Sequence, residues 1–152
     1  MVAVPIFRNL SKEPQIEVFF TNALIAALER HSNVSVVSDG GNAQGLLIGE
    51  ILSLEMIPAG RRQGGTLPVG VVLASEYRLV VRTRVSLVEG RSGQVLLSKE
   101  LQRERSYVTP QVAQVVVNTV NALYNHSARQ IHLEQLAKEM MEETAQLLVE
   151  SF

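Results

Sequence analysis

The sequence predicts an α+β fold, a two-layer α/β sandwich in which two long helices pack on one face of a mixed, largely antiparallel sheet. Two observations support this prediction. Apolar residues recur at helical spacing near both ends of the chain, and the long stretches between them alternate apolar and polar residues with the period of a strand. A length of 152 residues fits one domain, and we expect a single domain over residues 1–152.

The N-terminal part predicts a strand, a helix and a second short strand. Val2–Phe7 is a short apolar run that ends in polar residues, as a buried strand does. The helix is expected to begin at Ser11 or Lys12, because Pro14 then falls in the first turn, where proline is tolerated. Val34–Val37 predicts a strand that lies near the first one. The helix has an apolar stripe made of Ile16, Phe19, Phe20, Ala23, Leu24, Ala27 and Leu28.

The middle of the chain predicts three long strands in an antiparallel meander. Gln44–Ile57, Val71–Val88 and Gln94–Tyr107 each alternate between two faces. Residues 58–68 are rich in glycine and proline, which predicts a loop that no regular element accommodates. Glu89–Gly93 has the size and composition of a hairpin turn.

The C-terminal part predicts a second helix over Arg129–Ser151. Its apolar residues at helical spacing are Leu133, Leu136, Ala137, Met140, Met141, Thr144, Leu147 and Leu148. Before it, Thr109–His126 combines Pro110, asparagines and many β-branched residues, and this mixture predicts no clear element.

Composition excludes several classes of function. The chain has 14 basic and 15 acidic residues. No overall electrostatic field would therefore hold it on nucleic acid, and we expect no nucleic-acid partner. The chain has no cysteine and therefore no disulfide or thiolate chemistry. Its apolar runs are far shorter than the roughly 20 residues that a membrane-spanning helix needs.

Catalytic residues are not evident, and we expect a protein that is not an enzyme and needs no metal or cofactor. His126 and His132 lack the i, i+4 spacing of two metal ligands on one helix face, and His31 stands alone at a helix end. Glu142 and Glu143 are typical of a solvated helix face. Neither a phosphate-binding loop nor a Gly-x-Ser-x-Gly motif is present. A metal-dependent hydrolase would need histidines from distant parts of the chain.

Positive charge is concentrated in the predicted sheet. Arginine binds phosphate and carboxylate groups in a bidentate manner, so these residues could form an anion-binding or partner-binding face. They could equally be the solvent-facing side of the sheet, paired with Glu76, Glu100 and Glu104. The nine residues are Arg61, Arg62, Arg78, Arg82, Arg84, Arg91, Lys99, Arg103 and Arg105.

Several segments resemble the LptE family of lipopolysaccharide-assembly lipoproteins. They are Val2–Asn9, Glu17 with Thr21–Leu24, Leu47–Ile51, Ser75–Arg78 and the closing helix. The resemblance spans almost the whole chain and implies the same two-layer sandwich. It also implies a lipoprotein anchored on the periplasmic side of the outer membrane, which plugs an LptD-like β-barrel and helps to deliver lipopolysaccharide. The family's lipidated cysteine is missing here, as it would be in a sequence that begins after the lipidated segment.

The resemblance also implies lipopolysaccharide-binding residues. Basic residues of the family's hairpin loop and second helix correspond to Arg61, Arg62 and Arg129, which would pair with phosphates and break no bond. The expected lipopolysaccharide-binding set also includes Arg78, Arg82 and Arg84. An alternative is that Arg61 and Arg62 only keep an exposed loop soluble. A second hypothesis for the whole chain is a periplasmic scaffold domain resembling the N-terminal domain of TolB or the α/β domain of CsgG.

Overall fold

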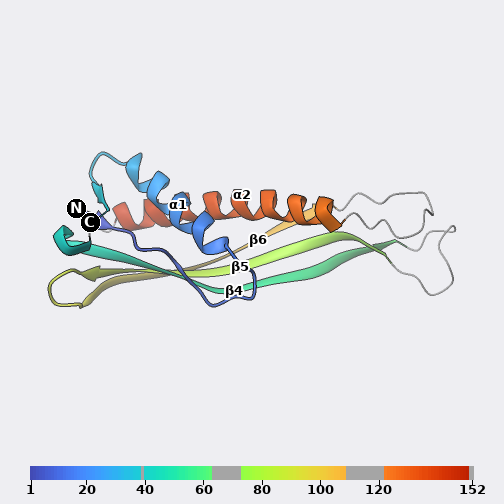
Figure 1. Cartoon of the computed structure of the whole chain (residues 1–152), viewed down its shortest axis with the longest axis horizontal. Coiled ribbons are helices and arrows are strands. Elements are labelled where there is room, and N and C mark those ends of the chain that lie inside the picture. Colours follow the sequence, from blue (N-terminus) through green and yellow to red (C-terminus); the bar gives the residue numbers. More distant parts are fainter. Residues whose placement is uncertain (39, 63–72, 109–121, 151–152) are drawn as a thin grey trace.

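The structure is a computed structural model that describes residues 1–38, 40–62, 73–108 and 122–150. Helices α1 (Ile16–Glu29) and α2 (Ala122–Val149) lie together on one face of an open sheet, and the other face carries no described helix (Figure 1). This arrangement confirms the predicted two-layer sandwich. The strands are β1 (Val2–Ala3), β2 (Arg8–Asn9), β3 (Val36–Val37), β4 (Gly45–Arg62), β5 (Leu73–Glu89) and β6 (Val95–Val108), and a short 3-10 helix covers Gly40–Asn42.

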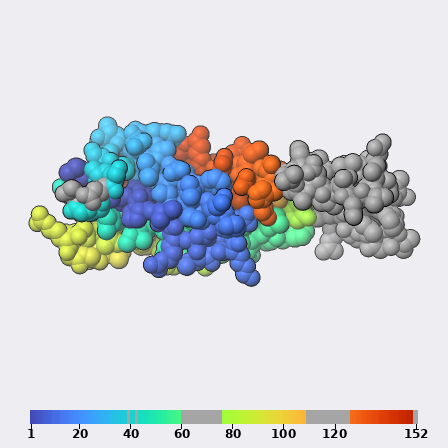
Figure 2. Space-filling model, in the orientation of Figure 1, coloured from blue at the N-terminus to red at the C-terminus, as the bar shows by residue number. Residues whose placement is uncertain are grey.

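The sheet is mixed and runs in the order β3-β1-β4-β5-β6, with β2 also paired to β4. Strand β1 pairs in parallel with β3 and β4, and β2 pairs in parallel with β4, whereas β4, β5 and β6 form a long antiparallel meander. The predicted meander is therefore confirmed, as is the expectation that the strand within 34–37 lies beside the first strand. The described body is elongated along these strands (Figure 2).

Helix α1 begins at Ile16, so the prediction of a start at Ser11 or Lys12 was wrong. The backbone at Gln15 explains the later start, because a left-handed residue cannot lie inside an α-helix, and the segment before it forms turns held by the side chains of Asn9 and Ser11. Asn9 Oδ1 accepts hydrogen bonds from Ser11 N at 3.0 Å and Ser11 Oγ at 2.6 Å, and Ser11 Oγ accepts one from Glu13 N at 3.2 Å. Gln15 then adopts a left-handed conformation with φ 69° directly before the helix.

Strand β4 continues to Arg62, so the prediction of a loop from residue 58 onward was wrong for residues 58–62. The ladder with β5 shifts register between Pro58 and Gly60 and again between Gly60 and Arg61. These irregularities accommodate Pro58 and Gly60 within β4, whereas a regular pairing of the two strands would disfavour both residues. Residues 63–68 of the predicted loop lie outside the described residues.

Two other boundaries differ from those predicted. Of the predicted strand Val2–Phe7 only Val2–Ala3 is a strand, β1, and Pro5, which has no backbone donor, follows it; Arg8 and Asn9, expected to lie beyond the strand, form β2. Helix α2 begins at Ala122 rather than Arg129, so the end of the segment that predicted no clear element is helical. The remainder of that segment, 109–121, lies outside the described residues.

Two bulges decide which residues face the helices. The ladder between β4 and β5 shifts register between Ile51 and Ser53, so Leu52 is an extra residue and the alternation of β4 is reversed beyond it. Before the bulge Leu47 and Ile51 are buried, and after it Leu54 of the opposite parity packs on the core. A similar shift near the start of β6 pairs Val95 with Val88 and leaves Val95 exposed, whereas Leu101 further along β6 is buried.

The core lies between the helices and the sheet. The predicted stripe of the first helix is confirmed, since Ile16, Phe20, Leu24, Ala27 and Leu28 are buried and the remaining members pack on the core. From α2 the core takes Leu133, Leu136, Ala137, Met140, Met141, Ala145 and Leu148. Phe7 is buried directly over Gly49, where a Cβ atom would overlap the Phe7 ring.

Candidate anion-binding surface

One row of charged residues crosses four strands on the sheet face that carries no described helix. The register places Arg8 of β2 beside Glu50 of β4, Glu50 beside Arg84 of β5, and Arg84 beside Glu100 of β6. Residues at equivalent positions of neighbouring strands point to the same face, so alternation within each strand brings all four side chains together. We refer to this row, together with Arg82, as the charge ladder.

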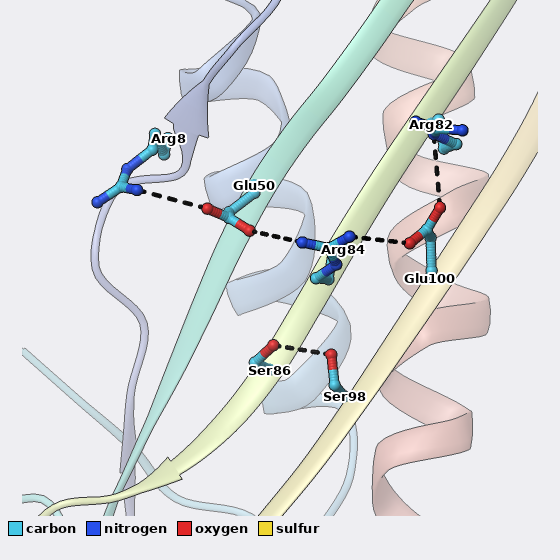
Figure 3. Close-up of polar contacts among 7 residues, drawn as sticks. All are labelled: Arg8, Glu50, Arg82, Arg84, Ser86, Ser98 and Glu100. Carbon is cyan, nitrogen blue, oxygen red and sulfur yellow. Dashed lines mark hydrogen bonds and ion pairs between the residues drawn. The ribbon is translucent and has the colours of Figure 1, made fainter. Parts of the chain in front are cut away.

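Ion pairs join the members of the charge ladder in sequence. Glu50 lies 3.6 Å from Arg8 and 3.5 Å from Arg84, and Glu100 lies 3.2 Å from Arg84 and 3.4 Å from Arg82 (Figure 3). Glu50 is the most enclosed member, with 21% of its side chain exposed. Ser86 and Ser98 form a hydroxyl pair at 2.9 Å beside the ladder.

Three of the expected lipopolysaccharide-binding residues form ion pairs with glutamates of β6. Arg82 and Arg84 share Glu100, and Arg78 lies 3.9 Å from Glu104. Each of the three is therefore already paired with a carboxylate. The pairing alternative weighed from the sequence is present for Glu100 and Glu104, while among the described residues no ion pair joins Glu76 to an arginine. Glu50, which the sequence analysis did not single out, is the additional partner.

Not all of the basic residues of the meander lie on this face. Arg103 and Arg105 share the parity of Leu101 and Tyr107 and point to the helix side of β6. There Arg103 pairs with Glu143 and Arg105 pairs with Glu139 at 2.7 Å, both on α2. These pairs connect the edge strand to the helix layer, so the positive charge of the meander is divided between its two faces.

Arg129, the expected binding residue of the second helix, lies in the helix layer on the other side of the sheet. Its guanidinium lies 3.1 Å from a carboxylate oxygen of Glu13 and 3.3 Å from His126 Nδ1, and its Nε is buried without a hydrogen-bond partner. Only 27% of the Arg129 side chain and 16% of the Glu13 side chain are exposed. The structure therefore separates Arg129 from the charge ladder.

Arg61 and Arg62 end strand β4, and their backbones pair with Ala74 and Leu73 of β5. The side chains of both arginines lie outside the described part of the structure. The expected binding residues consequently fall into three groups rather than one: the end of β4, the open sheet face and α2.

A polar network that the sequence analysis missed supports Arg129. Asn9 Nδ2 donates to the backbone oxygen of Glu13 at 2.6 Å and to Glu17 Oε2 at 2.9 Å. Glu13 in turn binds Arg129, so β2, the segment before α1 and α2 are joined by adjoining polar contacts. No spacing rule links Asn9 to Arg129 in the sequence, because only the tertiary fold brings them together.

Three stacked rings lie where β5 and β6 meet α2. The centroids of Tyr77 and Tyr107 are 5.8 Å apart and those of Tyr107 and His132 are 5.1 Å apart, with interplanar angles of 24° and 23°. Tyr107 Oη donates to Met56 Sδ at 3.2 Å. Burial raises the pKa of Tyr107, and the nearby Arg129 opposes this effect. We refer to Tyr77, Tyr107 and His132 as the aromatic stack.

Among the described residues, no three histidine, acidic or cysteine side chains are grouped so that they could hold a metal ion. Within the same part of the chain, neither helix is both long and apolar enough to cross a membrane.

The family model described as "LptE: Lipopolysaccharide-assembly" matches residues 1–151. The chain belongs to the LptE family. This is a non-enzymatic family of lipopolysaccharide-assembly lipoproteins, and the match confirms the resemblance drawn from the sequence. Among curated proteins, no sequence matches the chain.

Solved structures of low sequence identity share the fold of this LptE-family protein. The PelC dodecamer from Paraburkholderia phytofirmans has a TM-score of 0.54 at 14% identity, over 93% of this chain and 83% of the other. Protein XCC0632 from Xanthomonas campestris has a TM-score of 0.52 at 11% identity, over 95% and 80%. Lipoprotein GNA1162 from Neisseria meningitidis has a TM-score of 0.50 at 11% identity, over 86% and 96%. At these identities the likeness shows the fold alone.

Proposed function

We propose that this protein is a lipopolysaccharide-assembly lipoprotein of the outer membrane that works without catalysis. The observation that carries this proposal is the family match over residues 1–151. The protein would act on the periplasmic side, held by a lipid anchor, as a plug in an LptD-like β-barrel. There it would stabilise the barrel, bind lipopolysaccharide and help to transfer it toward the cell surface.

We assign the principal lipopolysaccharide site to the end of β4, where the family resemblance places Arg61 and Arg62, rather than to the open sheet face. An arginine that already pairs with a carboxylate must give up or share that contact to bind a phosphate, and Arg78, Arg82 and Arg84 are all paired in this way. Arg129 likewise pairs with Glu13. Arg61 and Arg62 are adjacent basic residues at the last two positions of β4, and we assign them the main phosphate contacts.

The binding test compares the purified protein with an Arg61→Glu/Arg62→Glu variant on lipopolysaccharide at low and physiological salt, with zwitterionic lipid as the control surface. We expect binding by the native protein that weakens with salt, and at least a tenfold loss of affinity in the variant. A Lys12→Glu/Arg91→Glu variant is the matched control. It makes the same change of net charge at two exposed residues that have no ion pair in the described structure, and it should keep its affinity.

Three results would contradict the binding proposal: no binding by the native protein, equal binding to zwitterionic lipid, or equal losses in the two double variants. The barrel proposal is tested separately by co-expression with an LptD-like barrel and purification of the barrel under mild detergent. We expect the protein to be recovered at one copy per barrel. If the barrel is purified at a normal yield and this protein is not recovered with it, the barrel proposal is overturned.

A further inference from the structure

The aromatic stack contains His132, whose pKa is lowered by burial first and by Arg105 second. His132 lies on α2, with its ring stacked on Tyr107 of β6, and Tyr107 lies in turn against Tyr77 of β5. Tyr107 is buried, so the ring of His132 forms part of the contact between the helix and the sheet. His132 therefore helps to hold the first half of α2 on strands β5 and β6.

The hydrogen bonding of His132 requires the neutral ring. Arg105 Nε donates to His132 Nδ1 at 3.3 Å, so Nδ1 must carry a lone pair and the ring proton must reside on Nε2. A second nitrogen of Arg105 donates to Glu139 at 2.7 Å, two helical turns further along α2. Arg105 is thus held beside His132 by its own ion pair.

The charges around His132 make a second proton unfavourable. Arg105 faces the ring from β6, and Arg129 lies one turn earlier on α2, near Tyr107. The acidic groups beside these two arginines are paired with them, Glu139 with Arg105 and Glu13 with Arg129. The other titratable neighbours are the phenols of Tyr77 and Tyr107 and the ring of His126, which contacts Arg129.

Protonation would change three interactions at once. Nδ1 would become a donor facing the donor Nε of Arg105, so the hydrogen bond would be lost and replaced by repulsion between two cations. The charged ring would also lose hydration in its partly buried position. A cation–π attraction to Tyr107 would offset part of this cost. Burial first and the facing Arg105 second oppose the charged ring, and both lower the pKa of His132.

We propose that the protonation state of His132 controls the packing of the first half of α2 on strands β5 and β6. The contact is stable when the ring is neutral and weakens when the ring is protonated. The proposal is independent of lipopolysaccharide binding, because it concerns only contacts within the chain. Its effect is local. The second half of α2 is held by buried residues such as Met140, Met141 and Leu148, none of which titrates.

Hydrogen exchange along α2 tests the proposal. Amide protection is measured between pH 7.5 and pH 5, with correction for the intrinsic pH dependence of exchange, in the native protein and in His132→Phe. Phenylalanine keeps a ring on Tyr107 but cannot take a proton. We expect protection of residues 126–136 in the native protein to fall several-fold toward pH 5, that of residues 140–148 to stay constant, and the variant to show no such fall.

A His31→Phe variant is the control, because His31 lies outside the aromatic stack, and it should behave like the native protein. Protection of residues 126–136 that is independent of pH in the native protein, or that falls equally in His132→Phe, would overturn the proposal. If His132→Phe folds poorly, the proposal is tested by the NMR titration of His132 in the native protein. A midpoint below 6.5 is expected, and a midpoint at or above 6.5 would overturn it.

Discussion

Glu50 and Arg84 are directly opposite each other on β4 and β5, and their side chains lie 3.5 Å apart on the sheet face away from the helices. Glu50 also contacts Arg8, and Arg84 also contacts Glu100, so this pair is the centre of a chain of charges across four strands. Single exposed ion pairs contribute little to stability, but members of one network reinforce each other. The ladder thus gives the open face a fixed and largely balanced charge pattern.

Replacing Glu50 should show how much the ladder contributes. Glu50→Gln removes the acceptor charge from two arginines and should lower the free energy of unfolding by about 1 kcal/mol. Urea unfolding measures this effect. Glu55→Gln lies on the same strand and has no ion pair in the described structure, so it should change stability by less than about 0.5 kcal/mol. Equal effects of the two substitutions would show that the ladder is not stabilising.

The contact between Phe7 and Gly49 should be intolerant of any added side chain. The Cβ of Gly49→Ala would overlap the Phe7 ring, and we expect a loss of about 1–3 kcal/mol by overpacking. The double variant with Phe7→Ala should be less destabilised than the sum of the two single variants, because the ring that collides is gone. Strict additivity in thermal or urea unfolding would contradict this packing.

The apolar face of α1 should carry much of the stability of the helix layer. Phe20 is fully buried between α1 and the sheet, so Phe20→Ala should cost about 3–5 kcal/mol through loss of burial and formation of a cavity. Val18, two residues earlier, is 42% exposed, and Val18→Ala should cost less than about 1 kcal/mol. An unchanged melting temperature for Phe20→Ala would contradict the packing of α1 on the sheet.

Variants of the ion pair between Arg129 and Glu13 should distinguish a structural role of Arg129 from a role in binding. A double-mutant cycle with Arg129→Gln and Glu13→Gln should give a coupling energy of about 1 kcal/mol, since both side chains are partly enclosed. If Arg129 also binds phosphate, Glu13→Gln should raise the affinity for lipopolysaccharide by freeing the guanidinium. Binding that responds to neither substitution would remove Arg129 from the predicted site.

Tyr107 predicts a dependence of stability on alkaline pH. Its pKa is raised by burial, so the folded state keeps the phenol proton at a pH where the unfolded chain has lost it. The stabilisation is complete below pH 10, the ordinary value, and declines as the pH rises above 10 toward the folded pKa. Ultraviolet titration should show one tyrosine ionising late, and Tyr107→Phe should abolish that step. Normal ionisation of all three tyrosines would contradict the burial of Tyr107.

The sequence alone determined the type and order of most elements. Periodicity identified both helices, because each must bury one stripe, and it identified the meander, because each long strand alternates between two environments. It also located the positive charge in the meander and indicated the family. These features depend on local spacing, which is visible in a single chain.

Only the tertiary structure decided which side chains meet. The bulge at Leu52 determines which parity of β4 faces the helices, and no local pattern announces it. The left-handed conformation of Gln15 places the start of α1 at Ile16, although proline and glutamate suggest an earlier start. The charge ladder and the aromatic stack join residues far apart in sequence, from Arg8 to Glu100 and from Tyr77 to His132. Such contacts follow from strand register and from the docking of α2, which depend on the packing of the whole domain.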